Sequence, residues 1–407
     1  MLHSSINHGQ VRLQKLLKYA VIVTVPEIKT LLINLTILGP HAAFILRWSL
    51  AAACIFAFFQ TNTIAQENDS KAITTEKCWE YIPDDPDTVT SSLAGSLLLL
   101  KGQSGRLEAV NSHDGTKEWS VEIGGEIISR PVYYNERIYL VSAASSPNGT
   151  GKKSVHLRSI SSMTGLPIAM TELPASDSYV LQTGDGRIMA IGSSGNLNAF
   201  DLDLKREWNI LIGGAVTAGP IKFKDGATFA SDDSVIRHVS LITGEILDRF
   251  PGDSLPTSIA RDANGTIYLG DDRGRLYRID PAAGKVIWTF KSGGRFESII
   301  SANGHILAAS VDNFLYKVSA SRGSVVWKRR LPGRILGDPL TGSDFLIVSV
   351  VGEGSAYIIE SDKGKIVGKI NFDDNLTPIT APVASDNGIM IFNLPGKVTA
   401  YRLGTCK

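Results

Sequence analysis

The chain is poor in the residues that build metal and redox sites. Among its 407 residues are only three cysteines and seven histidines, and no two cysteines are adjacent. No histidine stands two or four residues from another, so no local pair has the spacing of a metal-binding motif. A Gly-x-Ser-x-Gly nucleophile elbow and a phosphate-binding glycine loop are also missing. We therefore expect no catalytic residues, no metal and no cofactor, and a protein that is not an enzyme.

An excess of charge of one sign is lacking too. Lys and Arg number 41 against 40 Asp and Glu, a formal net charge of +1, which argues against a nucleic-acid binder driven by bulk electrostatics. No helical pattern occurs after residue 78. The 39 glycines instead flank many short runs of β-branched residues, which is typical of a turn-rich all-β protein.

The first 65 residues differ from the rest. The apolar stretch 16–38 is interrupted by charged residues and a proline, so it is a poor bilayer span. A second stretch, 48–59, follows Arg47, and the chain then reaches a small-x-Ala ending at Ala65, as in a secretory signal peptide. We interpret residues 1–65 as an N-terminal extension with a signal peptide, and 66–77 as a linker. A retained membrane anchor is the alternative; lipidation at Cys54 is less favoured because the apolar run continues beyond it.

One unit recurs along the remaining chain, and residues 274–288 (GRLYRIDPAAGKVIW) show it best. Two short strands flank a Pro/Gly turn, the expected chemistry of a hairpin. Further copies lie at residues 105–119, 155–169, 195–208, 235–248, 313–327 and 355–368, with a last half-copy at 396–403. The turn glycines repeat at a period near 40 residues and are Gly115, Gly165, Gly244, Gly284, Gly323 and Gly364. The third copy has no turn glycine and carries Leu204-Lys205-Arg206 there.

Each copy is preceded by two more strand-like runs, so one repeat is four strands. Radially arranged four-stranded units of this length are propeller blades. The alternative, one or two β-sandwiches, shows no fixed internal period. The end of a blade carries an aromatic residue in five places, Trp79, Trp119, Trp208, Trp288 and Trp327. We predict an all-β, eight-bladed β-propeller over residues 78–407.

The ends of the propeller predict how it closes. The last half-copy lacks a fourth strand, and the segment from Trp79 to Ile82 resembles a fourth strand without a third. Pairing it with residues 398–403 completes the eighth blade. Aligned on the unit 274–288, Cys406 takes the place of the turn glycine, and Cys78 takes the place of Ile287 across the same turn. We expect a disulfide between them; two free thiols are the alternative.

The pattern Gly-x-Leu-Tyr-x-Ile-Asp-x-x-x-Gly-Lys-x-x-Trp resembles the repeat of quinoprotein-like (PQQ-repeat) propellers. That resemblance implies that each tryptophan docks on the neighbouring blade. One branch holds quinone-dependent dehydrogenases with paired cysteines, a calcium site and a catalytic Asp. The other is the BamB family, the exported propeller of the outer-membrane β-barrel assembly machinery, and length, blade count and export favour it. The Asp pairs at 232–233, 271–272 and 373–374 are interpreted as turn formers.

The resemblance and the residues together predict an exported, non-catalytic scaffold that binds protein or peptide partners at the cell envelope, in the periplasm or attached to a membrane. The alternative is a PQQ-dependent dehydrogenase-like enzyme, or a small-ligand sensor, that uses the central channel. We expect a monomer and no nucleic-acid partner. The densest basic spot is the candidate partner-binding site and consists of Lys328, Arg329, Arg330 and Arg334.

Overall fold

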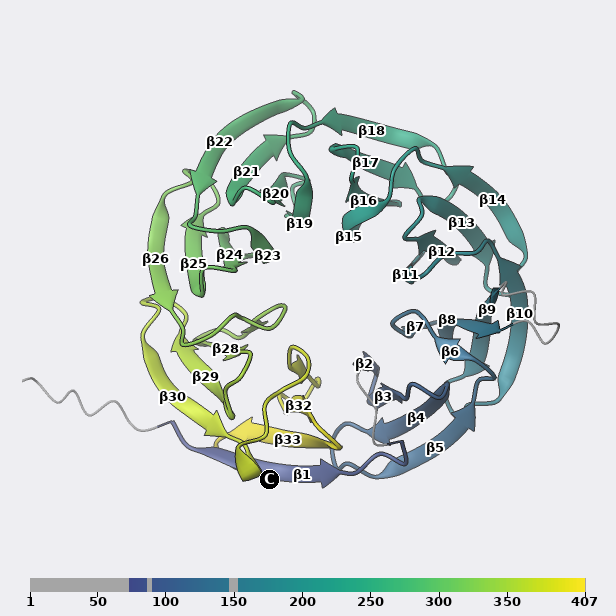
Figure 1. Cartoon of the computed structure of the whole chain (residues 1–407), viewed down its shortest axis with the longest axis horizontal. Helices are drawn as coiled ribbons and strands as arrows, with labels where there is room; N and C mark the ends of the chain where they lie inside the picture. Colours follow the sequence, from purple (N-terminus) through teal and green to yellow (C-terminus); the bar gives the residue numbers. More distant parts are fainter. Residues whose placement is uncertain (1–72, 86–89, 146–152, 407) are drawn as a thin grey trace, which may run out of the picture. The chain divides into compact units, whose positions relative to one another are not determined.

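The computed structural model describes residues 73–85, 90–145 and 153–406. In the unit formed by residues 71–407, the described strands make eight antiparallel sheets that follow one another around a central channel (Figure 1). The predicted all-β, eight-bladed propeller is confirmed. The predicted signal peptide, membrane anchor and most of the linker lie outside the described residues. In the described part of the chain, no helix is long and apolar enough to cross a bilayer.

Each blade runs from an inner strand at the channel to an outer strand at the circumference (Figure 1). The inner strands, in blade order, are β2 (Thr90–Ala94), β6 (Glu126–Ile127) with β7 (Val132–Tyr134), β11 (Tyr179–Gly184), β15 (Val216–Phe223), β19 (Pro256–Arg261), β23 (Phe296–Ala302), β27 (Leu340–Thr341) and β31 (Val383–Ala384). The second strands are β3 (Leu97–Lys101), β8 (Arg137–Ser145), β12 (Arg187–Gly192), β16 (Gly226–Ser231), β20 (Ile267–Asp271), β24 (His305–Ser310), β28 (Phe345–Ser349) and β32 (Met390–Leu394).

The third and outer strands complete the blades. The third strands are β4 (Arg106–Asn111), β9 (Lys153–Ser161), β13 (Asn196–Asp201), β17 (Val235–Ser240), β21 (Arg275–Asp280), β25 (Phe314–Ser319), β29 (Ser355–Glu360) and β33 (Lys397–Leu403). The outer strands are β5 (Lys117–Glu122), β10 (Pro167–Leu173), β14 (Arg206–Leu211), β18 (Ile246–Pro251), β22 (Lys285–Lys291), β26 (Val325–Arg330), β30 (Ile366–Asn371) and β1 (Thr75–Tyr81), the last belonging to blade 8.

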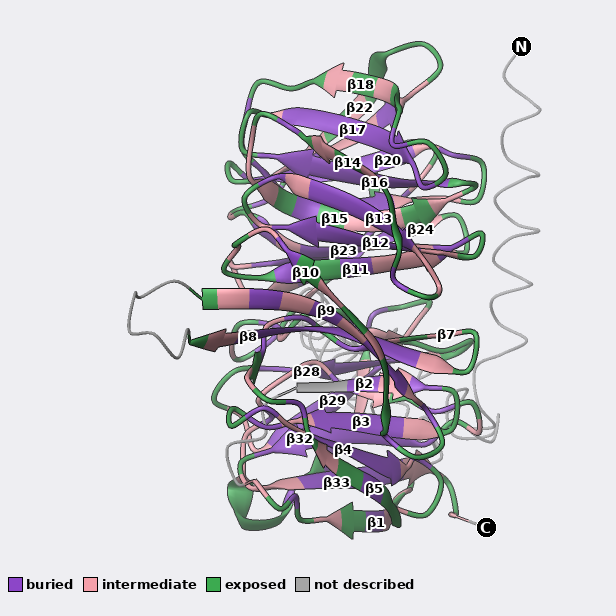
Figure 2. Ribbon diagram, turned by 90° about the vertical axis from the view of Figure 1, so that its right-hand side faces the viewer, coloured by how far each residue is buried: buried purple, intermediate pink, exposed green. Residues whose placement is uncertain are grey.

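The hydrophobic core lies between neighbouring blades. Leu107 and Trp119 of blade 1, for example, pack with Ile138 and Leu140 of blade 2 in one buried cluster. The second and third strands are covered on both faces and are buried along most of their length (Figure 2). The second strands are accordingly mostly apolar, as in LLLLK of β3 and FLIVS of β28. Outer strands alternate between buried and exposed side chains because only one face is covered.

Three inner strands are shortened or broken. β27 and β31 have two residues each, and the inner strand of blade 2 is split into β6 and β7. Prolines 131, 339 and 382 stand at these places. Because proline has no N–H to donate, the ladder is interrupted there. Blade 2 also has the longest second and third strands, β8 and β9, which project beyond the ring (Figure 2).

Candidate functional site

The ring is closed by strands from the two ends of the propeller. β1 pairs antiparallel with β33, with Thr75 opposite Leu403 and Tyr81 opposite Val398. Cys78 and Cys406 form a disulfide with their Cα atoms 5.4 Å apart. The closing strand begins at Thr75, four residues before Trp79, at which the predicted pairing starts, because backbone pairing continues where the side-chain pattern fades. The propeller is therefore a covalently closed ring.

Five of the junctions between neighbouring blades are made by a tryptophan. The indole Nε1 of Trp119 donates a hydrogen bond to the carbonyl oxygen of Ser162, at 2.8 Å, in the third-to-fourth-strand turn of blade 2. The ring lies over Gly165 of that turn, so close that a Cβ there would be 2.6 Å from it. The same arrangement holds for the pairs Trp79–Gly115, Trp208–Gly244, Trp288–Gly323 and Trp327–Gly364. The five tryptophans and the five turn glycines that they cover are thus contacts between blades.

The junctions that lack a tryptophan are built differently. In blade 2, Ala169 occupies the position of the tryptophan, and the facing turn of blade 3 has the buried Leu204 instead of glycine. Leu204 has φ +63°, so it keeps the backbone of a glycine turn while filling the space of the missing indole. In blade 4, Asp248 occupies the position of the tryptophan, and the space over Gly284 in the facing turn of blade 5 is open. A missing Trp therefore coincides with a changed or open turn.

A polar cluster occupies the junction between blades 4 and 5. Arg261 Nη1 donates to Thr228 Oγ1 at 2.6 Å, and its guanidinium lies 3.6 Å from the centroid of the Phe223 ring. Because Thr228 Oγ1 accepts from Arg261, its hydroxyl can donate to His238 Nδ1, which is 3.0 Å away. Burial, and then the positive charge of Arg261, hold the pKa of His238 below its usual value. His238 is therefore a neutral acceptor within the core.

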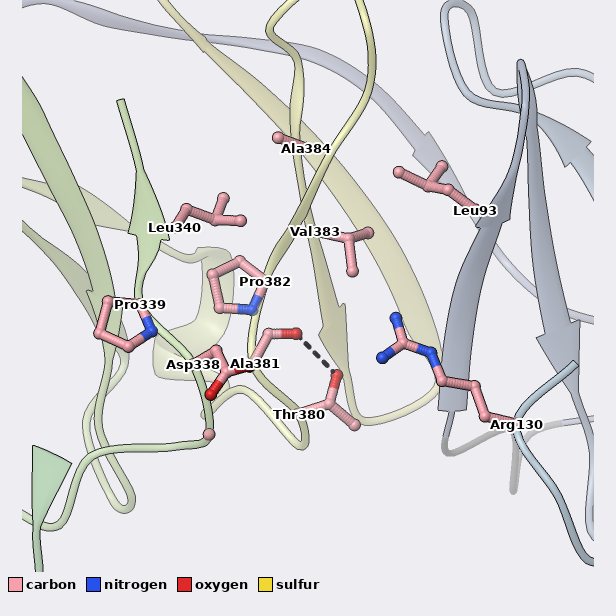
Figure 3. A pocket seen from close by; sticks show the side chains of 11 residues that line it. Leu93, Arg130, Asp338, Pro339, Leu340, Thr380, Ala381, Pro382, Val383 and Ala384 are labelled. Atoms are coloured by element: carbon pink, nitrogen blue, oxygen red, sulfur yellow. Dashed lines mark hydrogen bonds between the residues drawn. The ribbon is translucent and has the colours of Figure 1, made fainter. Parts of the chain in front are cut away.

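A recess of about 490 Å³ opens in the channel wall between the inner strands of blades 7, 8 and 1 (Figure 3). Leu93, Leu340 and Val383 line it with apolar surface, and Arg130 and Asp338 supply opposite charges. Asp338 already accepts a hydrogen bond from the hydroxyl of Ser298. Figure 3 shows the Arg130 guanidinium directed toward the strand that carries Val383.

The repeat register explains why these residues meet. Arg130, Asp338 and Ala381 each immediately precede a proline and stand four residues before the last pair of their inner hairpin. They are therefore equivalent positions of blades 2, 7 and 8. The small Ala381 leaves room between its charged counterparts. Arg130 is exposed and forms no hydrogen bond or ion pair with any described residue, so its planar guanidinium is available to an anionic group in the channel.

Sequence reasoning did not find this recess. The recurrence of the prolines was a usable signal, because the residue before each proline holds the same place in its blade. The repeat could not indicate which of the equivalent positions have charged side chains that line the same recess.

The four basic residues predicted as a partner-binding site do not form one cluster. Lys328 and Arg330 are exposed on the outward side of β26. Arg329 turns back and donates from Nε to the carbonyl oxygen of Gly364 at 2.5 Å. Arg334 lies in the crossing to the next blade and pairs with Glu297 of β23, with Nε 3.5 Å from Oε2. Two of the four therefore face outward from the ring.

The Asp-rich turns have structural partners. Asp271 is fully buried and accepts hydrogen bonds from Ser254 Oγ at 2.8 Å, Arg275 Nε at 2.7 Å and Tyr277 Oη at 3.0 Å. Burial alone would raise its pKa, but these hydrogen bonds and that from the Arg275 backbone outweigh it and lower the pKa. Asp233 pairs with Arg237, and Asp373 with Lys77. In the described part of the chain, no three His, Cys, Asp or Glu side chains are grouped to hold a metal.

The fold and the repeat define the class: a closed eight-bladed propeller whose repeats resemble those of PQQ-type propellers. A family model described as outer membrane protein assembly factor BamB matches residues 232–368 and 272–406. The chain is 22% identical over 323 residues to the outer membrane protein assembly factor BamB of Shewanella oneidensis, covering 76% of this chain and 70% of that protein. It is also 22% identical over 316 residues to the protein of the same name from Yersinia pestis, covering 77% and 70%.

Solved structures agree with the fold. The crystal structure of BamB from Moraxella catarrhalis matches with a TM-score of 0.63 at 14% identity, over 81% of this chain and 98% of that one. The computationally designed Ika8 protein matches with a TM-score of 0.65 at 12% identity, over 79% and 98%. At these identities the structural matches show the fold alone. The sequence matches add that the chain is similar to BamB propellers.

Proposed function

We propose that this protein is a non-catalytic scaffold at the cell envelope that binds protein partners during outer-membrane protein assembly. The observation that carries the proposal is the similarity to assembly factors, which extends over 76% of the chain in the Shewanella oneidensis alignment. A rigid ring supports the same role. Its blades are joined by indole–glycine contacts, and its ends are tied by a disulfide, so loops and outer strands are presented to partners in a fixed arrangement.

The experiment is affinity capture of the tagged full-length protein from envelope extracts of its own organism after mild chemical cross-linking. The expected result is specific recovery of the central outer-membrane β-barrel assembly protein, measured against an unrelated exported propeller as bait. Recovery of only abundant envelope proteins, at the level of that control, would contradict the proposed function.

We further propose that residues 1–65 direct export and that the propeller acts in the periplasm as a monomer, either free or attached to a membrane. The disulfide that closes the ring supports an oxidising compartment. Cell fractionation and the intact mass of the mature protein test this. An intact mass that corresponds to a chain starting at residue 66 supports cleavage after Ala65. The mass of the full-length chain, found in the cytosolic fraction, would overturn export.

A further inference from the structure

The outer strands present a regular row of outward side chains around the ring. In β26, Val326, Lys328 and Arg330 are exposed, whereas Trp327 is buried and Arg329 half-buried. The outward row of each blade therefore holds the residue before the Trp position and the residues one and three places after it. The register of the outer strands with their neighbours fixes the equivalent residues in all eight blades.

The charges in these rows are segregated by sign. The rows of blades 4 to 7, here called the basic arc, hold five cations and no carboxylate. They are Arg249, Lys291, Lys328, Arg330 and Lys369. The rows of blades 8, 1, 2 and 3, here called the acidic arc, hold five carboxylates and no cation, and all of these row residues are described. They are Glu80, Glu118, Glu122, Glu172 and Glu207. Exposed Lys77, Lys117 and Arg206 directly precede the rows of blades 8, 1 and 3.

The two arcs differ in how far their charges are neutralised. In the acidic arc, Glu80 pairs with Lys77 at 2.7 Å, Glu122 with Arg106 at 2.7 Å, and Glu207 with Arg187 at 2.5 Å.

In the basic arc, none of the five cations forms an ion pair with any residue that the structure describes. Lys328 and Lys369 lie over the rings of Phe314 and Tyr357, at 5.3 and 4.6 Å, and Lys291 donates to the carbonyl oxygen of Arg273. Such contacts leave the positive charge uncompensated.

Apolar side chains accompany these cations. β18, β22 and β26 each begin with a bulge at which one residue has no partner in the third strand. The bulge exposes two successive apolar residues instead of one. These residues are 39–54% exposed and are Ile246, Leu247, Val286, Ile287, Val325 and Val326. The basic arc is thus both cationic and apolar.

We propose that the basic arc binds an acidic surface of a partner protein. This rests on the proposed function as a scaffold and names the surface it would use. Lysines on edge strands also discourage edge-to-edge aggregation, but carboxylates would serve equally well. Segregation of the two signs into opposite arcs therefore indicates a directed contact. Uncompensated cations beside exposed β-branched residues give such a contact both electrostatic attraction and apolar burial.

The shape and composition of the basic arc favour a protein over a bilayer or a second copy. The arc curves outward around four blades (Figure 1), so a flat membrane would reach only part of it. Its outward rows contain no Trp, Tyr or Phe, the residues that are enriched at membrane interfaces. A second copy would have to offer its acidic arc, in which Glu80, Glu122 and Glu207 are already paired.

The test compares two charge-reversed variants of the purified full-length protein. Lys328→Glu with Arg330→Glu changes the basic arc. Lys222→Glu with Lys224→Glu makes the same change in charge at exposed positions of the end of β15 and the turn that follows it. Binding of a fluorescein-labelled peptide of alternating glutamate and valine is followed by anisotropy. We expect the arc variant to weaken binding roughly tenfold or more, about 1.4 kcal/mol, and the control variant to leave it within about twofold of wild type.

Equal losses of peptide affinity in both variants would show that the attraction is electrostatic but not localised to the basic arc, and would overturn the proposal. So would binding to phosphatidylglycerol vesicles, lost in the arc variant, without binding to the peptide. A salt-reversible dimer in sedimentation velocity that the arc variant abolishes would likewise overturn it.

A second measurement places a photo-cross-linking amino acid at Val326 in cells, with Ser120 in the acidic arc as the matched control. The expected product joins Val326 to an acidic segment of an envelope protein, and position 120 gives none. If the wild-type protein captures no assembly protein, the proposed function fails. If it does so but cross-links equally from both positions, only the basic arc fails.

Discussion

The indole of Trp288 in blade 5 lies directly over Gly323 in the turn of blade 6. Its Nε1 donates to the carbonyl oxygen of Ala320 at 3.0 Å, and a Cβ on Gly323 would stand 2.6 Å from the ring. The turn glycine of one blade and the tryptophan of the preceding blade are therefore two halves of one contact. Five of the junctions in the described ring use it.

Replacing Gly323 should cost more than replacing the equivalent glycine of the neighbouring blade. Gly323 and Gly284 have φ values of +69° and +60°, so Gly→Ala at either introduces similar backbone strain, about 1–2 kcal/mol. Only Gly323 is covered by an indole ring. A Cβ on Gly284 would have nothing within 4 Å. We expect Gly323→Ala to lower the free energy of unfolding by at least about 1–2 kcal/mol more than Gly284→Ala, measured by urea denaturation. Equal losses would contradict the contact.

Removing the indole should be more costly, and it should abolish the difference between the glycines. Trp288→Ala loses a large, half-buried aromatic and its hydrogen bond, which costs about 3–5 kcal/mol in comparable cases. In the Trp288→Ala background, Gly323→Ala no longer meets the ring and should cost only the backbone strain. A double-mutant cycle measures this coupling, and strictly additive losses would refute it.

Removing the disulfide should lower the free energy of unfolding, while the other parts of the ring stay folded. Cys78 and Cys406 are 328 residues apart in sequence, so in the chain-entropy model the bond contributes on the order of 6 kcal/mol by constraining the unfolded chain. The Cys78→Ser, Cys406→Ser double variant should show this loss in thermal unfolding, and a reductant should lower the Tm of wild type but not of the variant. A native protein in which both cysteines can be alkylated would contradict the closure.

Stability should fall in mild acid because of His238. Its pKa is lowered in the folded protein, chiefly by burial, so the unfolded chain takes up the proton first as pH decreases. The contribution of neutral His238 is complete above the unfolded pKa of about 6.5 and is lost progressively below it.

We therefore expect wild type to lose more Tm between pH 7.5 and 5.5 than His238→Gln, in which Thr228 keeps an amide partner. His113→Gln, at an exposed turn, is the control and should follow wild type. Parallel Tm–pH curves for all three proteins would show that His238 does not contribute to the acid sensitivity.

The ring and its closure could be predicted from sequence because their signals repeat. A turn glycine and a tryptophan recur at fixed spacing in most copies, and the leftover strands around Trp79 and Val398 fit together in only one way. Even the exception at Leu204 is consistent, since the missing glycine faces Ala169 instead of an indole.

The surfaces that could bind partners were not predictable in the same way. Arg130 and Asp338 line one recess only because blades 2 and 7 come near each other around the closed ring, with a small Ala381 between them. The basic arc depends on which residue of each outer strand faces outward. The bulge opposite Ile279, and its counterparts in the neighbouring blades, shift that alternation by one residue, which a hydrophobicity pattern cannot locate.

The most direct test of a role in outer-membrane assembly is the quantitative composition of the outer membrane after the gene is removed from its own organism. We predict a selective fall in the levels of β-barrel outer-membrane proteins. Expression of the wild-type chain should restore these levels, and the Lys328→Glu, Arg330→Glu variant should restore them less well. Unchanged β-barrel levels, with the deletion verified and no second copy of the gene present, would contradict it.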